Sequence, residues 1–98
     1  MDRIEECPVV IVGAGPIGLE TAIELKARGH EPVVVDGGAI GQQIVDFPPM
    51  TRWFSSAERL GIAGLPFVTS ASEKGTREEY LAYLRTAVAY FGIDVRTF

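Results

Sequence analysis

Residues 13–18 of this chain read Gly-Ala-Gly-Pro-Ile-Gly, a G-x-G-x-x-G pattern whose spacing suits a phosphate-binding turn. In such a turn Gly13 permits the tight bend, Gly15 lets the backbone approach a pyrophosphate, and Gly18 allows a helix to pack closely on a strand. Asp36 follows eighteen positions after Gly18, where a carboxylate can accept hydrogen bonds from an adenosine ribose. The pattern predicts an adenine dinucleotide site, with a purely structural tight turn as the alternative.

These residues can act together only if a strand precedes the glycines, a helix follows them, and a second strand ends at Asp36. Residues 9–12 are Val-Val-Ile-Val, a run typical of a strand buried on both faces of a parallel sheet. Pro16 suits the first position of a helix, which we expect to end at Gly29. Residues 8–36 therefore predict a strand–helix–strand unit with two parallel, neighbouring strands.

A second long helix is predicted for residues 76–91. Thr76 would be its N-cap and Glu79 the partner in a capping box, and apolar residues recur along one helical face. A third strand begins near Ile93. We therefore expect an α/β chain with a partial Rossmann-like FAD/NAD(P)-binding fold, in which a parallel sheet of strand order 3-2-1 is flanked by helices. This order leaves residues 9–12 as an open apolar edge that invites further strands or another chain.

Residues 37–75 show no sustained periodicity, which is uncommon for a connection of this length unless it has a function. One short helix is predicted to begin with a capping box at Ser55 and to end at Leu60. Gln42 and Gln43 could donate amide hydrogen bonds to a flavin, or could lie in a plain loop. The aromatic residues of the segment are expected to pack in the core or, for the central two, to cover a flavin ring. They are Phe47, Trp53, Phe54 and Phe67.

The composition argues against several kinds of function. The chain has 98 residues and a net charge of −4, so it lacks the basic surface with which proteins bind nucleic acid. One cysteine, Cys7, and one histidine, His30, provide neither an internal disulfide nor a recognisable metal site. The sequence contains neither a secretory leader pattern nor an apolar stretch of membrane-spanning length. We expect a cytoplasmic protein with no nucleic-acid or membrane partner.

The residues around Asp36 narrow the choice of dinucleotide. A carboxylate at this position would repel the 2′-phosphate of NADP, and no Lys or Arg follows it to compensate, since the next residue is Gly37. The site therefore suits NAD or FAD. The long segment after Gly37 favours FAD, because a flavin needs more surrounding protein than a mononucleotide fold supplies.

Residues 9–19 resemble the FAD-binding start of the thioredoxin-reductase-like flavoproteins, a group of FAD-dependent pyridine nucleotide-disulfide oxidoreductases. Later segments are similar to one branch of that group, the YpdA-type bacillithiol-disulfide reductases. The resemblance covers the chain from about Val9 to Phe98. The segments that carry the narrower resemblance are Phe47-Pro48, Met50-Thr51, residues 53–60, Ile62, residues 65–67 and Thr76-Arg77.

This resemblance implies an FAD-containing, NADPH-dependent oxidoreductase that reduces a small-molecule disulfide. It also implies that residues 1–98 are the N-terminal part of an FAD-binding domain, truncated before an NADPH domain. The cofactor-binding residues that it implies are Gly13, Gly15, Pro16, Ile17 and Gly18 at the pyrophosphate, Asp36 beside Gly37 at the ribose, and Gln42, Gln43 and Thr51 near the flavin.

The chain departs from the family pattern at two positions. Asp36-Gly37 stands where the wider family has Glu followed by a basic residue, and Ile17 stands where some members of the narrower branch have a cysteine. No Cys-x-x-Cys pair is present, and no catalytic residue is identified. The alternatives left open are an FAD-dependent monooxygenase or other flavin oxidoreductase, and a non-catalytic dinucleotide-binding module. A homo-oligomer formed through the open sheet edge is a further expectation.

Overall fold

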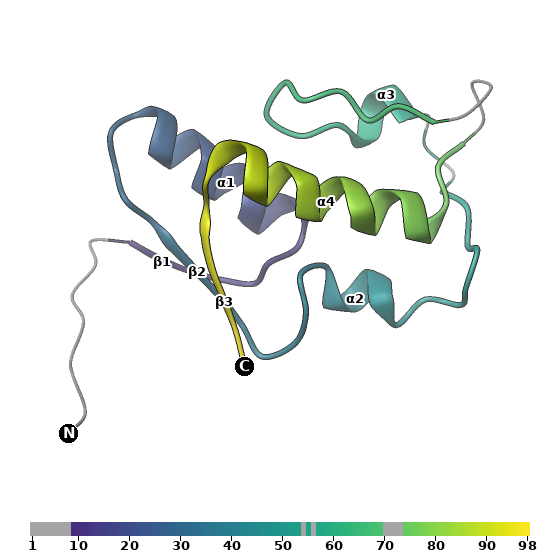
Figure 1. Cartoon of the computed structure of the whole chain (residues 1–98), viewed down its shortest axis with the longest axis horizontal. Helices are drawn as coiled ribbons and strands as arrows, with labels where there is room; N and C mark the ends of the chain where they lie inside the picture. The colour runs from purple at the N-terminus through teal and green to yellow at the C-terminus, as the bar shows by residue number, and fades with distance from the viewer. Residues whose placement is uncertain (1–8, 54, 56, 70–73) are drawn as a thin grey trace.

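The computed structural model describes residues 9–53, 55, 57–69 and 74–98. Helices separate its strands along the chain, as expected for an α/β chain (Figure 1). They are β1 (Val10–Val12), α1 (Pro16–Ala27), β2 (Val33–Asp36), α2 (Gln42–Val45), α3 (Ala57–Leu60), α4 (Arg77–Phe91) and β3 (Asp94–Thr97). Cys7 and Phe54, considered above, lie outside the described residues. Within these residues, no helix combines the length and the apolar character needed to cross a membrane.

The three strands form one parallel sheet in the order β1-β2-β3, which confirms the predicted strand order. Ile11 of β1 lies opposite Val34 of β2, and Val34 lies opposite Val95 of β3. These three side chains form a row that packs into the hydrophobic core, and Val34 is fully buried. Parallel neighbours need a crossover connection, and α1 and α4 lie in the two connections of this sheet.

The helices leave one face of β1 open. α1 contacts both β1 and α4 (Figure 1). Leu19 and Leu84 of the two helices are fully buried in the same core. Val10 and Val12 are 53% and 84% exposed, so the prediction that this strand is buried on both faces is wrong. Side chains alternate across a strand. Among the described residues, only the side of β1 that carries Ile11 faces the helical layer.

α1 begins and ends as the sequence predicts and lies very close to β1. Pro16 is its first residue, and the chain leaves the helix through Arg28 and through Gly29, whose φ is +90°. A Cβ placed on Gly18 would lie 2.0 Å from the carbonyl oxygen of Gly13. Only glycine therefore allows the first turn of α1 to approach the strand this closely.

α4 has the predicted capping box at its start. The backbone N–H of Glu79 donates to Thr76 Oγ1 (3.2 Å), and the backbone N–H of Thr76 donates to Glu79 Oε1 (3.0 Å). Gly92, with φ +65°, ends the helix in the left-handed conformation. Both ends of α4 are therefore satisfied by local residues, and its buried face packs into the core.

Two short helices and a cluster of aromatic rings organise the segment between β2 and α4. α3 matches the predicted short helix, although the Glu58 side chain of its predicted capping box lies outside the described ones. α2 is not predicted, because four residues give no helical period. Trp53 packs as expected, with its ring centroid 5.7 Å from that of Phe47 and 5.3 Å from that of Tyr80.

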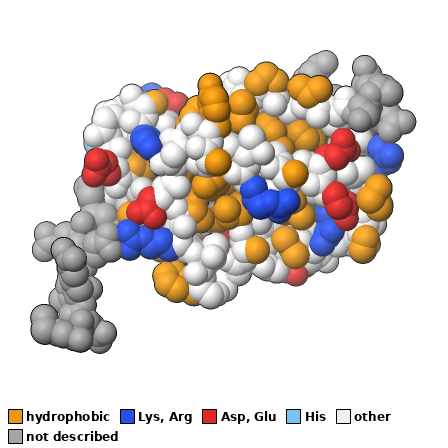
Figure 2. Space-filling model, viewed as in Figure 1, with side chains coloured by type: hydrophobic (Ala, Val, Ile, Leu, Met, Phe, Trp, Pro, Cys, Tyr) orange, Lys and Arg blue, Asp and Glu red, His pale blue; other side chains and the backbone are white. Residues whose placement is uncertain are grey.

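The surface mixes charged and apolar side chains. On the face seen in Figure 2, acidic and basic groups are interspersed, with apolar groups between them. Several large apolar side chains are exposed, among them Val12, Ile17, Met50 and Val68. Two of these lie next to glycines of the motif, since Val12 precedes Gly13 and Ile17 precedes Gly18.

We predict that Thr76→Ala lowers the free energy of unfolding by about 1 kcal/mol, because the N–H of Glu79 loses its acceptor. Urea unfolding followed by circular dichroism measures this change. Thr86→Ala is the matched control, since Thr86 is an exposed residue of the same helix whose hydroxyl donates only to the Ala82 carbonyl. Equal losses in the two variants would contradict the capping role.

Candidate dinucleotide-binding site

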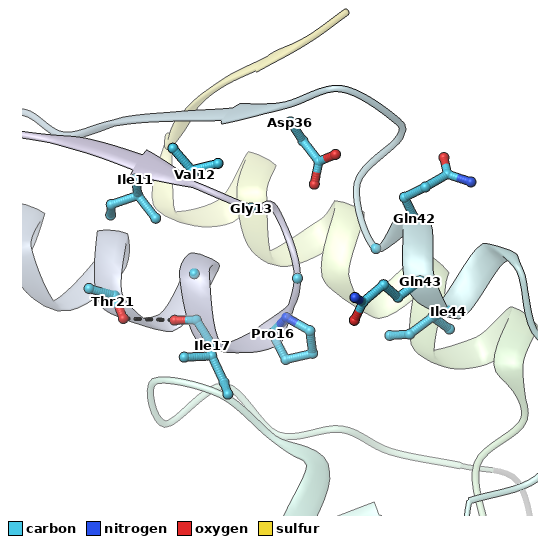
Figure 3. A pocket seen from close by; sticks show the side chains of 13 residues that line it. Ile11, Val12, Gly13, Pro16, Ile17, Thr21, Asp36, Gln42, Gln43 and Ile44 are labelled. Atoms are coloured by element: carbon cyan, nitrogen blue, oxygen red, sulfur yellow. Dashed lines mark hydrogen bonds between the residues drawn. The ribbon is translucent and has the colours of Figure 1, made fainter.

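The glycine turn, the start of α1, the end of β2 and the start of α2 surround one hollow (Figure 3). Its volume is about 620 Å³. It lies where β1 and β2 end, the edge at which doubly wound sheets bind their ligands. Eight of the predicted residues line it: Gly13, Gly15, Pro16, Ile17, Gly18, Asp36, Gln42 and Gln43.

Three hydrogen bonds hold the glycine turn to the chain that follows α1. The N–H of Gly13 donates to the Val35 carbonyl (2.8 Å). The N–H of Ala14 donates to Asp36 Oδ2 (2.8 Å), and the carbonyl of Ala14 accepts from the N–H of Gly41 (2.9 Å). The turn is therefore positioned by β2 and by the residues between β2 and α2, as well as by its own glycines.

The carboxylate of Asp36 accepts two backbone hydrogen bonds. The N–H of Ala14 donates to Oδ2, and the N–H of Gly38 donates to Oδ1 at 2.9 Å. These two bonds, that from Ala14 first, lower the pKa of Asp36 below its ordinary value of 3.8, because they favour the charged form, while slight burial acts in the opposite direction. Each carboxylate oxygen retains a second acceptor position, so the group can still accept from a ribose hydroxyl.

The first turn of α1 supplies donors for an anion. Among the described residues, the backbone N–H groups of Gly15, Ile17 and Gly18 have no hydrogen-bond partner, and Pro16 has no N–H. Unpaired N–H groups and the positive end of the helix dipole favour a phosphate at this place. No atom outside residues 14–16 lies within 4 Å of the position that a Cβ on Gly15 would take, so a phosphate can approach the backbone there. The residues present therefore fit a dinucleotide pyrophosphate.

The two glutamines of α2 differ in the hydrogen bonds that their side chains form. The side chain of Gln42 accepts from the N–H of Ala39 (2.8 Å) and donates to Asp46 Oδ1 (3.0 Å), so it stabilises its own helix. The side chain of Gln43 points toward Pro16 and the start of α1 (Figure 3). Within the described part of the chain, Gln43 is the glutamine of α2 whose amide has no protein partner, and it is available to a ligand.

Gly37 and Thr51 lie outside the lining of the hollow. Gly37 follows Asp36 and has open space around its Cα. Thr51 lies between α2 and α3, where its hydroxyl donates to the Pro48 carbonyl (2.5 Å) and its carbonyl accepts from the N–H of Arg77 (2.7 Å). The predicted roles of these two residues at the cofactor remain predictions.

Some of the lining is not indicated by the sequence pattern. Thr21 lies one helical turn after Ile17, and its hydroxyl donates to the Ile17 carbonyl at 2.8 Å (Figure 3). Because Thr21 comes four residues after Ile17 of the motif, on the same face of the expected helix, the spacing could have identified Thr21 as a lining residue. No signal in the sequence indicates Gly41, because its place depends on the path of the chain after β2. The unpredicted lining residues are Ile11, Val12, Thr21, Gly41 and Ile44.

The fold and the hollow define an α/β protein that presents a glycine turn and a helix N-terminus at the edge of a parallel sheet. The sequence matches the pyridine nucleotide-disulphide oxidoreductase family over residues 10–98, and the chain belongs to that family. A curated relative is bacilliredoxin reductase Bdr of Bacillus subtilis (strain 168), with 37% identity over 79 residues, which cover 81% of this chain and 24% of the relative.

Solved structures with a similar fold include two disulfide reductases and a flavin monooxygenase. Bacillithiol disulfide reductase Bdr (YpdA) from Staphylococcus aureus matches 97% of this chain with a TM-score of 0.92 and 32% identity, and the match covers 29% of that protein. The enzyme of the same name from Bacillus cereus matches 96% with a TM-score of 0.91 and 36% identity, again over 29% of its length. A flavin monooxygenase from Stenotrophomonas maltophilia matches 94% with a TM-score of 0.86 and 28% identity, over 28% of that chain.

These matches confirm the predicted resemblance and the predicted fold class. The chain spans about a quarter of the length of the curated relative that it matches.

We predict that Asp36→Asn destabilises the fold by about 1 kcal/mol at neutral pH, because an amide can accept only one of the two N–H groups. The pKa of Asp36 is lower in the folded chain than in the unfolded chain. The charged carboxylate therefore contributes to the free energy of unfolding above pH 3.8, and this contribution is lost as the pH falls through the folded pKa. The difference between the parent and the variant in urea unfolding should therefore shrink below pH 3.8.

Asp94→Asn is the control for this titration. Hydrogen bonding to Arg96 is the main cause that lowers the pKa of Asp94, but this pair is half exposed, so its contribution should be small and sensitive to salt. If the effect of Asp36→Asn stayed constant across the acidic range, the two backbone bonds would not be what Asp36 contributes.

Proposed function

We propose that this chain is the FAD-binding N-terminal part of an NAD(P)H-dependent flavin oxidoreductase that reduces a low-molecular-weight thiol disulfide. The observation that carries the proposal is the convergence of unpaired N–H groups and the Asp36 carboxylate on one hollow at the edge of the sheet. The family match and the similarity to bacilliredoxin and bacillithiol disulfide reductases support it.

In this proposal the pyrophosphate of FAD lies at the glycine turn. The N–H groups of Gly15, Ile17 and Gly18 donate to it, and Gly13 leaves room for it. Charge-assisted hydrogen bonds of this kind are about twice as strong as neutral ones, and the dipole of α1 adds to them. This part of the chain would therefore supply most of the affinity for the phosphates.

The adenosine ribose would lie beside Asp36 and Gly37. The carboxylate can accept a ribose hydroxyl while it still holds the N–H of Ala14, and the open space at Gly37 leaves access to it. A 2′-phosphate would meet a negative charge at the same place, so we assign this site to FAD and place NADPH binding outside residues 1–98. The share of the relatives that the chain covers is compatible with such a division.

The flavin would extend from the pyrophosphate toward α2. Gln43 is the residue of α2 best placed to donate to it, whereas Gln42 and Thr51 would act by holding α2 and the following loop in place. When bound, FAD supplies the two-electron chemistry that joins a nicotinamide cofactor to a disulfide, and the role of the protein is to position it. Ile17 places no thiol at the start of α1, so no thiol relay is proposed there.

A flavin monooxygenase is the second candidate. The observation that favours it is the match to the Stenotrophomonas maltophilia flavin monooxygenase over 94% of the chain. The glycine turn serves both reactions equally, because it binds the dinucleotide rather than the substrate. A non-catalytic dinucleotide-binding module would use the same turn without turnover.

We predict that Gly15→Val abolishes FAD retention, because the added side chain occupies the space that the pyrophosphate needs. Flavin absorbance of the purified intact protein measures retention, and circular dichroism reports whether it is folded. Gly64→Val is a stringent control, since Gly64 has φ +77° and open space around it in the loop that follows α3. Unchanged flavin content in Gly15→Val would show that the dinucleotide does not bind at this turn.

We predict that the intact protein is yellow and oxidises NADPH without oxygen when bacillithiol disulfide is supplied. The two readouts are NADPH absorbance under anaerobic conditions and the release of thiol. Oxygen-dependent oxidation of NADPH coupled to oxygenation of a substrate would instead favour the monooxygenase. A colourless protein that cannot be reconstituted with FAD would favour the non-catalytic module.

A further inference from the structure

Ala14 is held on both of its peptide groups by residues distant in the sequence. It is fully buried, its N–H donates to Asp36 Oδ2, and its carbonyl accepts from the N–H of Gly41 at 2.9 Å. Ala14 thus connects the first and second glycines of the turn while making no contact of its own with solvent. The two bonds fix the orientation of the peptide groups on either side of it.

The carbonyl of Ala14 and the N–H of Gly15 belong to the same peptide group. No cis peptide bond occurs among the described residues, so the two groups point in opposite directions. The carbonyl points toward Gly41, a buried residue whose Cα faces Leu81 and Leu84 of α4. The N–H of Gly15 therefore points away from Gly41, and it has no partner among the described residues.

We propose that Gly41 is a positioning residue for the pyrophosphate, and that its hydrogen bond to Ala14 aims the N–H of Gly15 at the phosphate. This inference rests on the proposed dinucleotide binding and adds a residue that the glycine motif does not contain. It also connects the phosphate donor to the packing of α4, because Gly41 lies against that helix.

Two independent features require glycine at position 41. Its φ of +70° is in the left-handed region, which strains any residue with a Cβ. A Cβ there would lie 2.8 Å from Leu81 Cδ2 and 3.3 Å from Leu84 Cδ1, on the side of α4. A larger residue would therefore move the N–H of residue 41 away from Ala14 rather than fill the space that the ligand needs.

The test is Gly41→Ala in the intact protein, stripped of flavin and titrated with FAD by calorimetry. We expect the affinity for FAD to fall about tenfold, which corresponds to the partial loss of one charge-assisted hydrogen bond. In a proton–nitrogen NMR spectrum, the Gly15 N–H should move downfield when FAD binds to the parent, and this shift should be reduced in the variant.

Gly92→Ala is the matched control. Gly92 has φ +65°, and its added Cβ would meet only the end of the Lys26 side chain at 3.0 Å, far along the chain from the turn. It carries a similar backbone strain without a bond to Ala14, so FAD binding should be within about twofold of the parent. Equal affinity of Gly41→Ala and Gly92→Ala for FAD, with an unchanged Gly15 shift, would overturn the inference.

A variant that relieves the contact with α4 keeps the test decisive if Gly41→Ala does not fold. Leu81→Ala together with Gly41→Ala removes the side chain that the new Cβ would strike at 2.8 Å. Stronger FAD binding in this double variant than in Gly41→Ala, or weak binding where only the double variant folds, supports the inference. Where both variants fold, equal FAD affinity in the two contradicts it, and where only the double variant folds, parental affinity contradicts it. A parent that binds no FAD at all contradicts the proposed function instead, so the two failures are distinguishable.

Discussion

The close approach of α1 to β1 is the constraint on which the rest of the site depends. A Cβ on Gly18 would stand 2.0 Å from the Gly13 carbonyl oxygen, so the helix can lie this close only because that side chain is absent. The approach brings the N-terminus of α1 to the edge where the strands end. The unpaired N–H groups therefore lie at the same edge as Asp36, which ends β2.

The parts of the structure that the sequence predicts are those in which a local requirement selects particular residues. The tight turn selects Gly13, a helix start selects Pro16, and the capping box needs Thr76 and Glu79 at their spacing. The strand order follows from the doubly wound arrangement that the glycine motif predicts, in which the first three strands lie in the order 3-2-1. Six of the predicted site residues also come together, because the motif and Asp36 lie at the ends of neighbouring strands.

The parts that the sequence does not predict depend on how layers and loops pack. A run of four β-branched residues has the same appearance whether one face of the strand is covered or both, so the exposure of Val10 and Val12 could not be anticipated. Gln42 and Gln43 are the same residue type in adjacent positions. Only the rotation of α2 separates them, by turning one amide onto Ala39 and Asp46 and the other toward the hollow.

Within residues 1–98 taken alone, β1 lies at the edge of the sheet, and this has a consequence for local opening. Val9 and Gly13 bond to β2, so the backbone groups of the alternate residues Val10 and Val12 face away from it, and their side chains are exposed as well. So short and little-covered a strand would separate from the sheet at a lower free energy than the core, and the glycine turn would open with it. A dinucleotide that bound only the closed turn would suppress this opening by mass action. Occupancy of the site would then stabilise the part of the sheet that its own packing protects least.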